Sequence, residues 1–294
     1  MKTIIVPTDF SVAANNAAHY AVHLAKALRM DITLCHAIDK VPADTPLAEH
    51  VVWPMESYAS LKRETTAELK LLAEQLTHED ELVSKNPANR VRLESLSIGG
   101  QLCEVAEDIV NQKKASLVVM GMSGHGAIGQ MVFGSNARLI VDAATYPVLM
   151  IPPQRVFRPI QKIAFATDLD KGDMDLLQTV STLAGHFNAE ILLAHVTRDE
   201  QPTGNDKRRT EDFLSMISSK ALYPKIYYRH VKGHTVEQGL NWLNAHGDVD
   251  ILVIVHRKEG FFKRLFEGSH TQKMAHQCAI PLLVLPEGLS LTHF

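Results

Sequence analysis

The sequence predicts an α/β protein with two doubly wound, five-stranded parallel sheets. Short apolar segments rich in β-branched residues alternate with segments of helical period, which is the pattern of βαβ units. Strands such as SLVVM (116–120) and ILVIV (251–255) are continuously apolar, as expected where helices cover both faces of a parallel sheet. The length of 294 residues fits about two domains.

An internal repeat supports the prediction of two domains. The opening KTIIVPTDFS returns as QKIAFATDLD, and the later segment TYPVLMIP returns as AIPLLVLP. The matched pairs are Asp9 with Asp168, His36 with His195, Ser135 with Ser269, and Pro147 with Pro281. The first two pairs are 159 residues apart and the last two are 134 apart. The second half is therefore shorter, by about 25 residues, between its second and third strands.

Each half is expected to supply its elements in the same order. In the first half we expect strands at 3–8, 32–38, 91–97, 116–121 and 147–151, and helices at 15–28, 56–76, 102–112 and 134–144. In the second half we expect strands at 162–167, 190–196, 225–231, 250–256 and 281–285, and helices at 174–187, 207–220, 235–245 and 269–279. The domains then span 1–152 and 160–294. Prolines at both ends of the intervening segment, 153–159, favour an extended linker.

Composition narrows the functional classes. The formal net charge of −3 gives no electrostatic footprint for nucleic acid. No segment approaches the roughly 18 consecutive apolar residues of a membrane span. Cys35, Cys103 and Cys278 are odd in number and far apart, which favours reduced thiols. We therefore expect a cytoplasmic protein that binds neither nucleic acid nor membrane.

The glycine-rich stretch from Gly121 to Ser135 fits three phosphate-binding patterns to different degrees. Residues 124–129 spell the dinucleotide fingerprint G-x-G-x-x-G, but that motif belongs after the first strand, and this stretch follows the fourth. The same residues begin a P-loop, which fails because Gln130 and Met131 replace its Lys and Ser or Thr. The wider pattern G-x2-G-x9-G-S remains.

The wider pattern has a physical rationale at this position. Gly121 and Gly124 would let backbone N–H groups approach phosphate oxygens, and Ser135 opens a helix whose positive end favours an anion. Asp9, at the end of the first strand, can accept hydrogen bonds from a ribose or a base. The alternative is structural: the loop is a flexible connection, Ser135 is a helix cap, and Asp9 is a cap or turn residue.

These motifs, in this order, resemble the universal stress proteins, specifically the tandem type with two such domains in one chain. The resemblance rests on IIVPTDFS, HAID, GMSGHGAIGQMVFGSNA and YPVLMIP, and it covers essentially the whole chain. It implies a Rossmann-like fold of the adenine-nucleotide α-hydrolase type. It also implies that the two domains pair through their last strands as an intramolecular pseudo-dimer, with a homodimer of tandem chains as a further possibility.

In that family the glycine pattern marks the members that bind ATP. Carried over to this chain, the nucleotide-contacting residues are Pro7, Thr8, Asp9, Ala37, Met120, Gly121, Gly124, His125, Gly134, Ser135 and Asn136. The expected ligand is ATP, with AMP and ADP left open, and Mg or Mn would accompany it. No cluster of protein ligands in the sequence requires a metal, and the protein partner stays unknown.

The second half departs from the pattern. Aligned on the shared Gly-Ser, Gly121 becomes Val255 and Gly124 becomes Lys258, so ATP is not expected there. The basic residues of this loop are Arg257, Lys258, Lys263 and Arg264. They form either a site for another anion or a solvated loop.

The sequence offers no dedicated catalytic set, because it lacks a P-loop lysine and a G-x-S-x-G elbow. We expect slow ATP hydrolysis at most, with His125 as a phosphate contact or loop residue. His36 and His195 end matched strands, which favours a repeated packing or pocket role over metal binding. The predicted function is a nucleotide-dependent regulator or binder in stress response. The alternative is a non-enzymatic tandem scaffold for another small molecule or a protein partner.

Overall fold

A computed structural model describes residues 2–39, 55–83, 90–122, 135–197, 204–232, 242–243, 248–257, 280–289 and 294. The strands are β1 (Thr3–Pro7), β2 (Asp31–Ile38), β3 (Leu93–Gly99), β4 (Leu117–Gly121), β5 (Val148–Ile151), β6 (Lys162–Ala166), β7 (Glu190–Thr197), β8 (Ile226–Lys232), β9 (Ile251–His256) and β10 (Leu282–Pro286). The helices of this described part are α1 (Val12–Leu28), α2 (Met55–Val83), α3 (Leu102–Lys113), α4 (Ser135–Ala143), α5 (Asp173–Phe187) and α6 (Gly204–Lys220).

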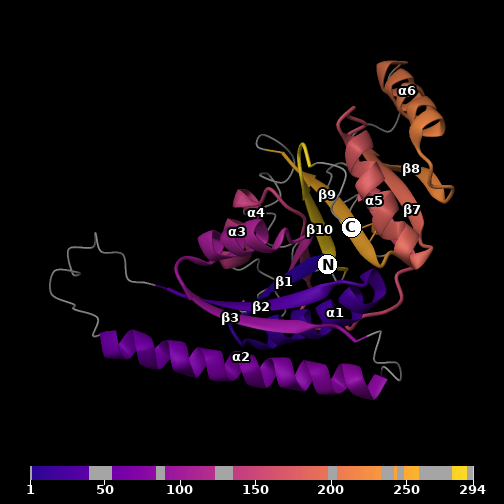
Figure 1. Ribbon diagram of the computed structural model, residues 1–294. Helices are drawn as coiled ribbons and strands as arrows, with labels where there is room; N and C mark the ends of the chain where they lie inside the picture. Colours follow the sequence, from indigo (N-terminus) through magenta and orange to yellow (C-terminus); the bar gives the residue numbers. More distant parts are fainter. Residues whose placement is uncertain are drawn as a thin grey trace, which may run out of the picture.

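All the described strands form one sheet, in the order β3-β2-β1-β4-β5-β10-β9-β6-β7-β8 (Figure 1). Within each half the strands are parallel. The halves meet where β5 pairs antiparallel with β10, with Leu149 opposite Leu283. The predicted doubly wound fold and the pairing through the last strands are both confirmed.

The strand register reproduces the offsets of the sequence repeat. Ile4 pairs with Leu117 in the first half, and Ile163 pairs with Ile251 in the second. The first members of these pairs are 159 residues apart and the second members 134 apart, as in the sequence alignment. Positions in the two halves can therefore be compared residue by residue at β1, β2, β4 and β5.

Three helices extend by more than one residue beyond their predicted bounds, and α6 is one of them, beginning at Gly204 instead of residue 207. α1 begins at Val12 instead of residue 15, because the Ser11 hydroxyl accepts a hydrogen bond from the Ala14 N–H at 3.2 Å and caps the helix. α2 runs to Val83, past the predicted end at residue 76. The helices expected at 235–245 and 269–279 fall outside the described residues, apart from Trp242 and Leu243, which are helical. In the part of the chain that is described, no helix is both long and apolar enough to cross a membrane.

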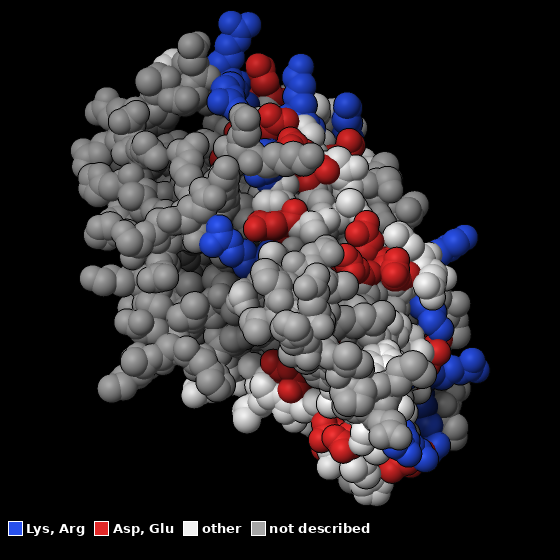
Figure 2. Space-filling view, turned by 90° about the vertical axis from the view of Figure 1, so that its left-hand side faces the viewer, with Lys and Arg blue, Asp and Glu red and all other residues white. Residues whose placement is uncertain are grey.

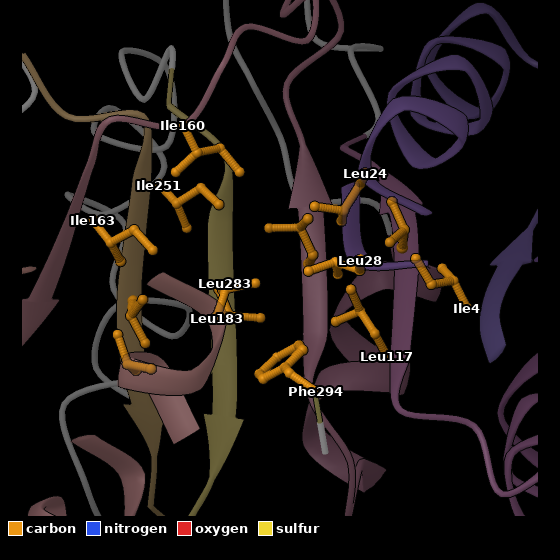
Figure 3. Packing of buried hydrophobic residues seen from close by; sticks show 14 of the residues in the cluster. Ile4, Leu24, Leu28, Leu117, Ile160, Ile163, Leu183, Ile251, Leu283 and Phe294 are labelled. Carbon is orange, nitrogen blue, oxygen red and sulfur yellow. The ribbon is translucent and has the colours of Figure 1, made fainter. Parts of the chain in front are cut away.

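The hydrophobic core continues across the junction between the halves. On one face of the sheet, a single cluster contains Leu24 and Leu117 from the first half with Ile163 and Leu283 from the second (Figure 3). A second cluster on the other face likewise joins Val148 to residues of β9 and β10. The halves therefore share their core instead of folding around two separate ones.

The segment at 153–159 opens with a turn closed by the Arg155 N–H on the Pro152 carbonyl at 3.0 Å, continues without helix or strand, and packs on both halves. Asn16 on α1 donates side-chain hydrogen bonds to the Pro152 and Arg155 carbonyls at 3.0 and 3.2 Å. The Arg155 guanidinium lies 3.5 Å from the Asp250 carboxylate, just before β9. Phe157 packs edge-on against Tyr20, with ring centroids 5.1 Å apart. The segment thus fastens α1 of the first half to the second half.

We predict that Phe157→Ala lowers the free energy of unfolding by about 2 kcal/mol, because it removes an aromatic ring that is partly buried against α1. Urea unfolding would measure the loss. Val156→Ala is the matched control, because that side chain is 70% exposed and its removal should change stability by less than about 0.5 kcal/mol. Equal effects of the two substitutions would contradict the packing role of Phe157.

Candidate functional site: a cavity at the carboxyl edge of the first half

A cavity of about 700 Å³ opens at the carboxyl ends of β1, β2 and β4. Its walls come from these strand ends and from the first turns of α1, α3 and α4. The lining residues are Pro7, Thr8, Asp9, Ser11, Ala13, Ala14, His36, Ala37, Asp39, Gln101, Leu102, Cys103, Met120, Gly121, Asn136, Ala137 and Leu139. Ligands of open parallel sheets bind at this edge, and the volume lies within the usual range for small-molecule sites.

Residues predicted from distant parts of the sequence come together in this cavity. Those that line it are Pro7, Thr8, Asp9, Ala37, Met120, Gly121 and Asn136. Ser135 begins α4 as expected but is not among the lining residues. Gly124, His125 and Gly134 lie outside the described residues. The ligand contacts of the whole predicted set stay a prediction.

A tight turn after β1 presents Thr8 and Asp9 to the cavity. The Thr8 hydroxyl accepts a hydrogen bond from the Phe10 N–H at 3.0 Å, and Phe10 adopts a left-handed conformation with φ of 60°. Phe10 also stacks on the His36 ring, with centroids 5.0 Å apart. His36 Nδ1 lies 2.8 Å from the Thr8 carbonyl oxygen, which can only accept, so Nδ1 carries a proton. The turn is thereby fixed to β2.

The same turn occurs in the second half. His195 Nδ1 lies 2.9 Å from the Thr167 carbonyl oxygen, and Leu169 has φ of 60°. The Thr167 hydroxyl accepts the Leu169 N–H at 2.9 Å. The repeated role predicted for the paired histidines, in packing or in a pocket, is seen as this bond in both halves, and His36 also lines the cavity.

Asp9 combines a turn contact with a place in the cavity wall. One oxygen of its carboxylate accepts the Ser11 N–H at 3.0 Å, and the residue is exposed. Ser11, not Asp9, is the cap of α1. Asp9 is therefore a turn residue, as the structural alternative held, and it also lines the cavity.

Gly121 is required by packing before any ligand is considered. A Cβ at this position would lie 2.4 Å from the Ala13 carbonyl oxygen and 2.9 Å from the Ala14 nitrogen, both in the first turn of α1. Such contacts are with backbone atoms, which cannot turn aside. The sequence analysis offered ligand approach or a flexible connection for this glycine, and neither interpretation includes this close contact with α1.

In the second half the corresponding helix and strand differ at this contact. Val255 stands at the position of Gly121 and carries a Cβ, and α5 begins at Asp173, two residues later in the aligned numbering than α1. Arg257 is only 20% exposed and is paired with carboxylates of its own chain. It belongs neither to a solvated loop nor to an open anion site, and both sequence interpretations are wrong for this residue. Lys258, Lys263 and Arg264 lie outside the described residues.

Comparison with known proteins identifies the family. The model of the universal stress protein family matches residues 1–152 and again residues 159–286. The chain belongs to the universal stress protein family.

Its relatives include universal stress proteins about as long as this chain and others about half as long. One from Mycolicibacterium smegmatis is 23% identical over 295 residues, covering 96% of each chain. One from Thermus aquaticus is 30% identical over 150 residues, covering 51% of this chain and 98% of its own. The crystal structure of an Archaeoglobus fulgidus universal stress protein aligns with a TM-score of 0.72 at 15% identity, covering 97% of this chain and 98% of that one. At 15% identity, the similarity to this crystal structure is evidence for the fold alone.

Sequence reasoning missed the α3 side of the cavity. Gln101, Leu102 and Cys103 line it because α3 follows β3 at the same edge of the sheet. The glycines of the SIGG segment mark this turn, with Gly100 at φ of 152°, and could have indicated it. Burial raises the pKa of the Cys103 thiol, and it raises that of the fully buried Cys35 to about 12.

Charges on the described surface are mixed in sign. On the face in Figure 2, Lys and Arg side chains lie among Asp and Glu side chains. Among the described residues several opposite charges pair directly, such as Arg90 with Glu81 at 2.7 Å and Lys113 with Glu94 at 2.7 Å.

We predict that Gly121→Ala lowers the free energy of unfolding by about 2 kcal/mol without any ligand present, because the new Cβ pushes α1 away from β4. Urea unfolding would measure it. Gly185→Ala is the control, because Gly185 lies within α5 and its new methyl group would meet no atom within 4 Å. This control should be neutral or stabilising by up to about 1 kcal/mol. A Gly121 variant as stable as the Gly185 variant would disprove the close approach.

Proposed function

We propose that the first half binds an adenine nucleotide in the 700 Å³ cavity. The occupant is ATP, for which AMP and ADP compete. One observation carries the proposal: the cavity at the ends of β1, β2 and β4 and the start of α4 is lined by Gly121 of the glycine pattern and by six further residues named from the family resemblance. The membership of the chain in the universal stress protein family supports it.

The cavity offers suitable groups for each part of the nucleotide. The Asp9 carboxylate can accept hydrogen bonds from ribose hydroxyls. The backbone around Ala37 is proposed to face the base. The first turn of α4, with Ser135 and Asn136, would stabilise terminal phosphates through its N–H groups and helix dipole. Gly124, His125 and Gly134 complete the proposed set. Mg or Mn would be held mainly by phosphate oxygens and water.

We propose that the nucleotide is a signal and not a substrate for rapid turnover. Fast phosphoryl transfer needs a positioned base and a charge clamp, and the sequence pattern supplies only a cradle. Hydrolysis of bound ATP would be slow. The protein would act in the cytoplasm, in stress response, as a regulator whose nucleotide state is sensed by a protein partner.

Titration calorimetry with ATP and Mg would test the proposal. We expect one site per chain, and we expect Asp9→Asn to weaken binding about tenfold because a charge-assisted hydrogen bond to ribose is lost. Asp108→Asn, on the exposed side of α3, is the control and should bind as the wild type does. No binding by the wild-type protein at about 1 mM ATP would refute the proposal.

Alkylation of Cys103 gives an independent measure of occupancy. Cys103 lines the cavity and is partly exposed, so ATP should slow its reaction with a maleimide several-fold. Cys35 is fully buried and should stay unmodified with or without ATP. Mass spectrometry of the Cys103 peptide would follow the reaction. An unchanged rate under saturating ATP would place the nucleotide elsewhere.

A further inference from the structure

Arg257 makes an unusual set of contacts at the carboxyl edge of the second half. Its Nη1 lies 3.0 Å from the Asp168 carboxylate, its Nη2 contacts Asp173, and its Nε lies 3.5 Å from Glu287. These partners follow β6, begin α5 and follow β10, respectively. One guanidinium therefore connects three elements that are distant in sequence.

The position of this guanidinium corresponds to the cavity of the first half. Asp168 is equivalent to Asp9, and Asp173 is equivalent to Ala14, by the offset of 159 residues. Asp9 and Ala14 both line the 700 Å³ cavity. In the second half Arg257 spans the two equivalent positions.

The local charges also differ between the halves. The first turn of α1 contains no acidic residue, whereas the first turn of α5 contains Asp173 and Asp175. Asp173 is completely buried and also accepts a hydrogen bond from the Thr167 hydroxyl at 2.6 Å. A buried carboxylate is costly unless it is paired, so the contact with Arg257 is the essential one. The other two carboxylates are more than half exposed and contribute less.

We propose that Arg257 is a built-in ligand of the second half: its guanidinium occupies the space equivalent to the nucleotide cavity and neutralises the buried Asp173. The second-half site is then a cation site already filled by its own chain. Its carboxylates would repel nucleotide phosphates. The second half is held together without any external ligand, and this inference does not depend on nucleotide binding by the first half.

The proposal predicts a specific dependence on pH. Burial raises the pKa of Asp173, while Thr167 and Arg257 act in the opposite direction and Asp168 adds to the rise. Among the described residues, the cavity beside it also contains the carboxylates of Asp175 in α5 and Glu287 after β10. Without Arg257 the pKa should rise further. The folded state then favours protonated Asp173, so the missing arginine costs stability at high pH and costs less as the pH falls.

Urea unfolding of the full chain at about pH 5 and about pH 8, without nucleotide, would test this. We expect Arg257→Met to lower the urea midpoint clearly at the higher pH and much less at the lower pH. Adding Asp173→Asn to Arg257→Met should restore most of the midpoint at the higher pH, because the unpaired buried charge is gone. Arg257→Lys keeps the positive charge but loses the planar guanidinium that reaches several carboxylates at once, so its urea midpoint should lie between those of the wild type and Arg257→Met.

Arg90→Met is the matched control, because Arg90 forms an exposed pair with Glu81 and its loss should barely change the midpoint at either pH. The proposal is overturned if Arg257→Met behaves like Arg90→Met. It is also overturned if the loss is the same at both pH values, or if Asp173→Asn restores nothing. Because no nucleotide is present, failure here leaves the proposed function of the first half intact, and the reverse also holds.

Discussion

The antiparallel pairing of β5 with β10 is the constraint on which the arrangement of the whole molecule depends. It joins two five-stranded parallel sheets edge to edge, so that neither last strand is left open to solvent. Because the joined sheet is continuous, the hydrophobic clusters on its two faces are continuous as well. The segment at 153–159 then adds polar and aromatic contacts that fasten α1 to the second half.

Within this shared frame, the two halves differ where a helix meets the fourth strand. Gly121 lets α1 begin early and lie directly against β4, and Gly121 also lines the open cavity at the strand ends. Val255 occupies the aligned position, α5 begins later, and Arg257 fills the corresponding space. A different residue at this one aligned position thus accompanies a different site in each half.

The turn after the first strand has been kept in both halves despite this difference. The residue two positions after each threonine, Phe10 or Leu169, has the same left-handed φ of 60°. His36 and His195 each form a hydrogen bond with the carbonyl of the threonine in their half. The turn is therefore part of the fold and does not report on ligand binding. In the first half the turn exposes Asp9 to the cavity, and in the second its counterpart Asp168 pairs with Arg257.

The sequence by itself determined the repeat, the order of the strands along the chain and the α/β class, because periodicity and internal similarity are local signals. Its resemblance to the universal stress proteins also named seven residues that line the cavity. Only the tertiary structure decided the role of Gly121 and the pairing of Arg257. Arg257 lies 84 and 89 residues from its partners Asp173 and Asp168, and Gly121 meets α1 across the sheet edge. Such contacts depend on interatomic distances that no local pattern encodes.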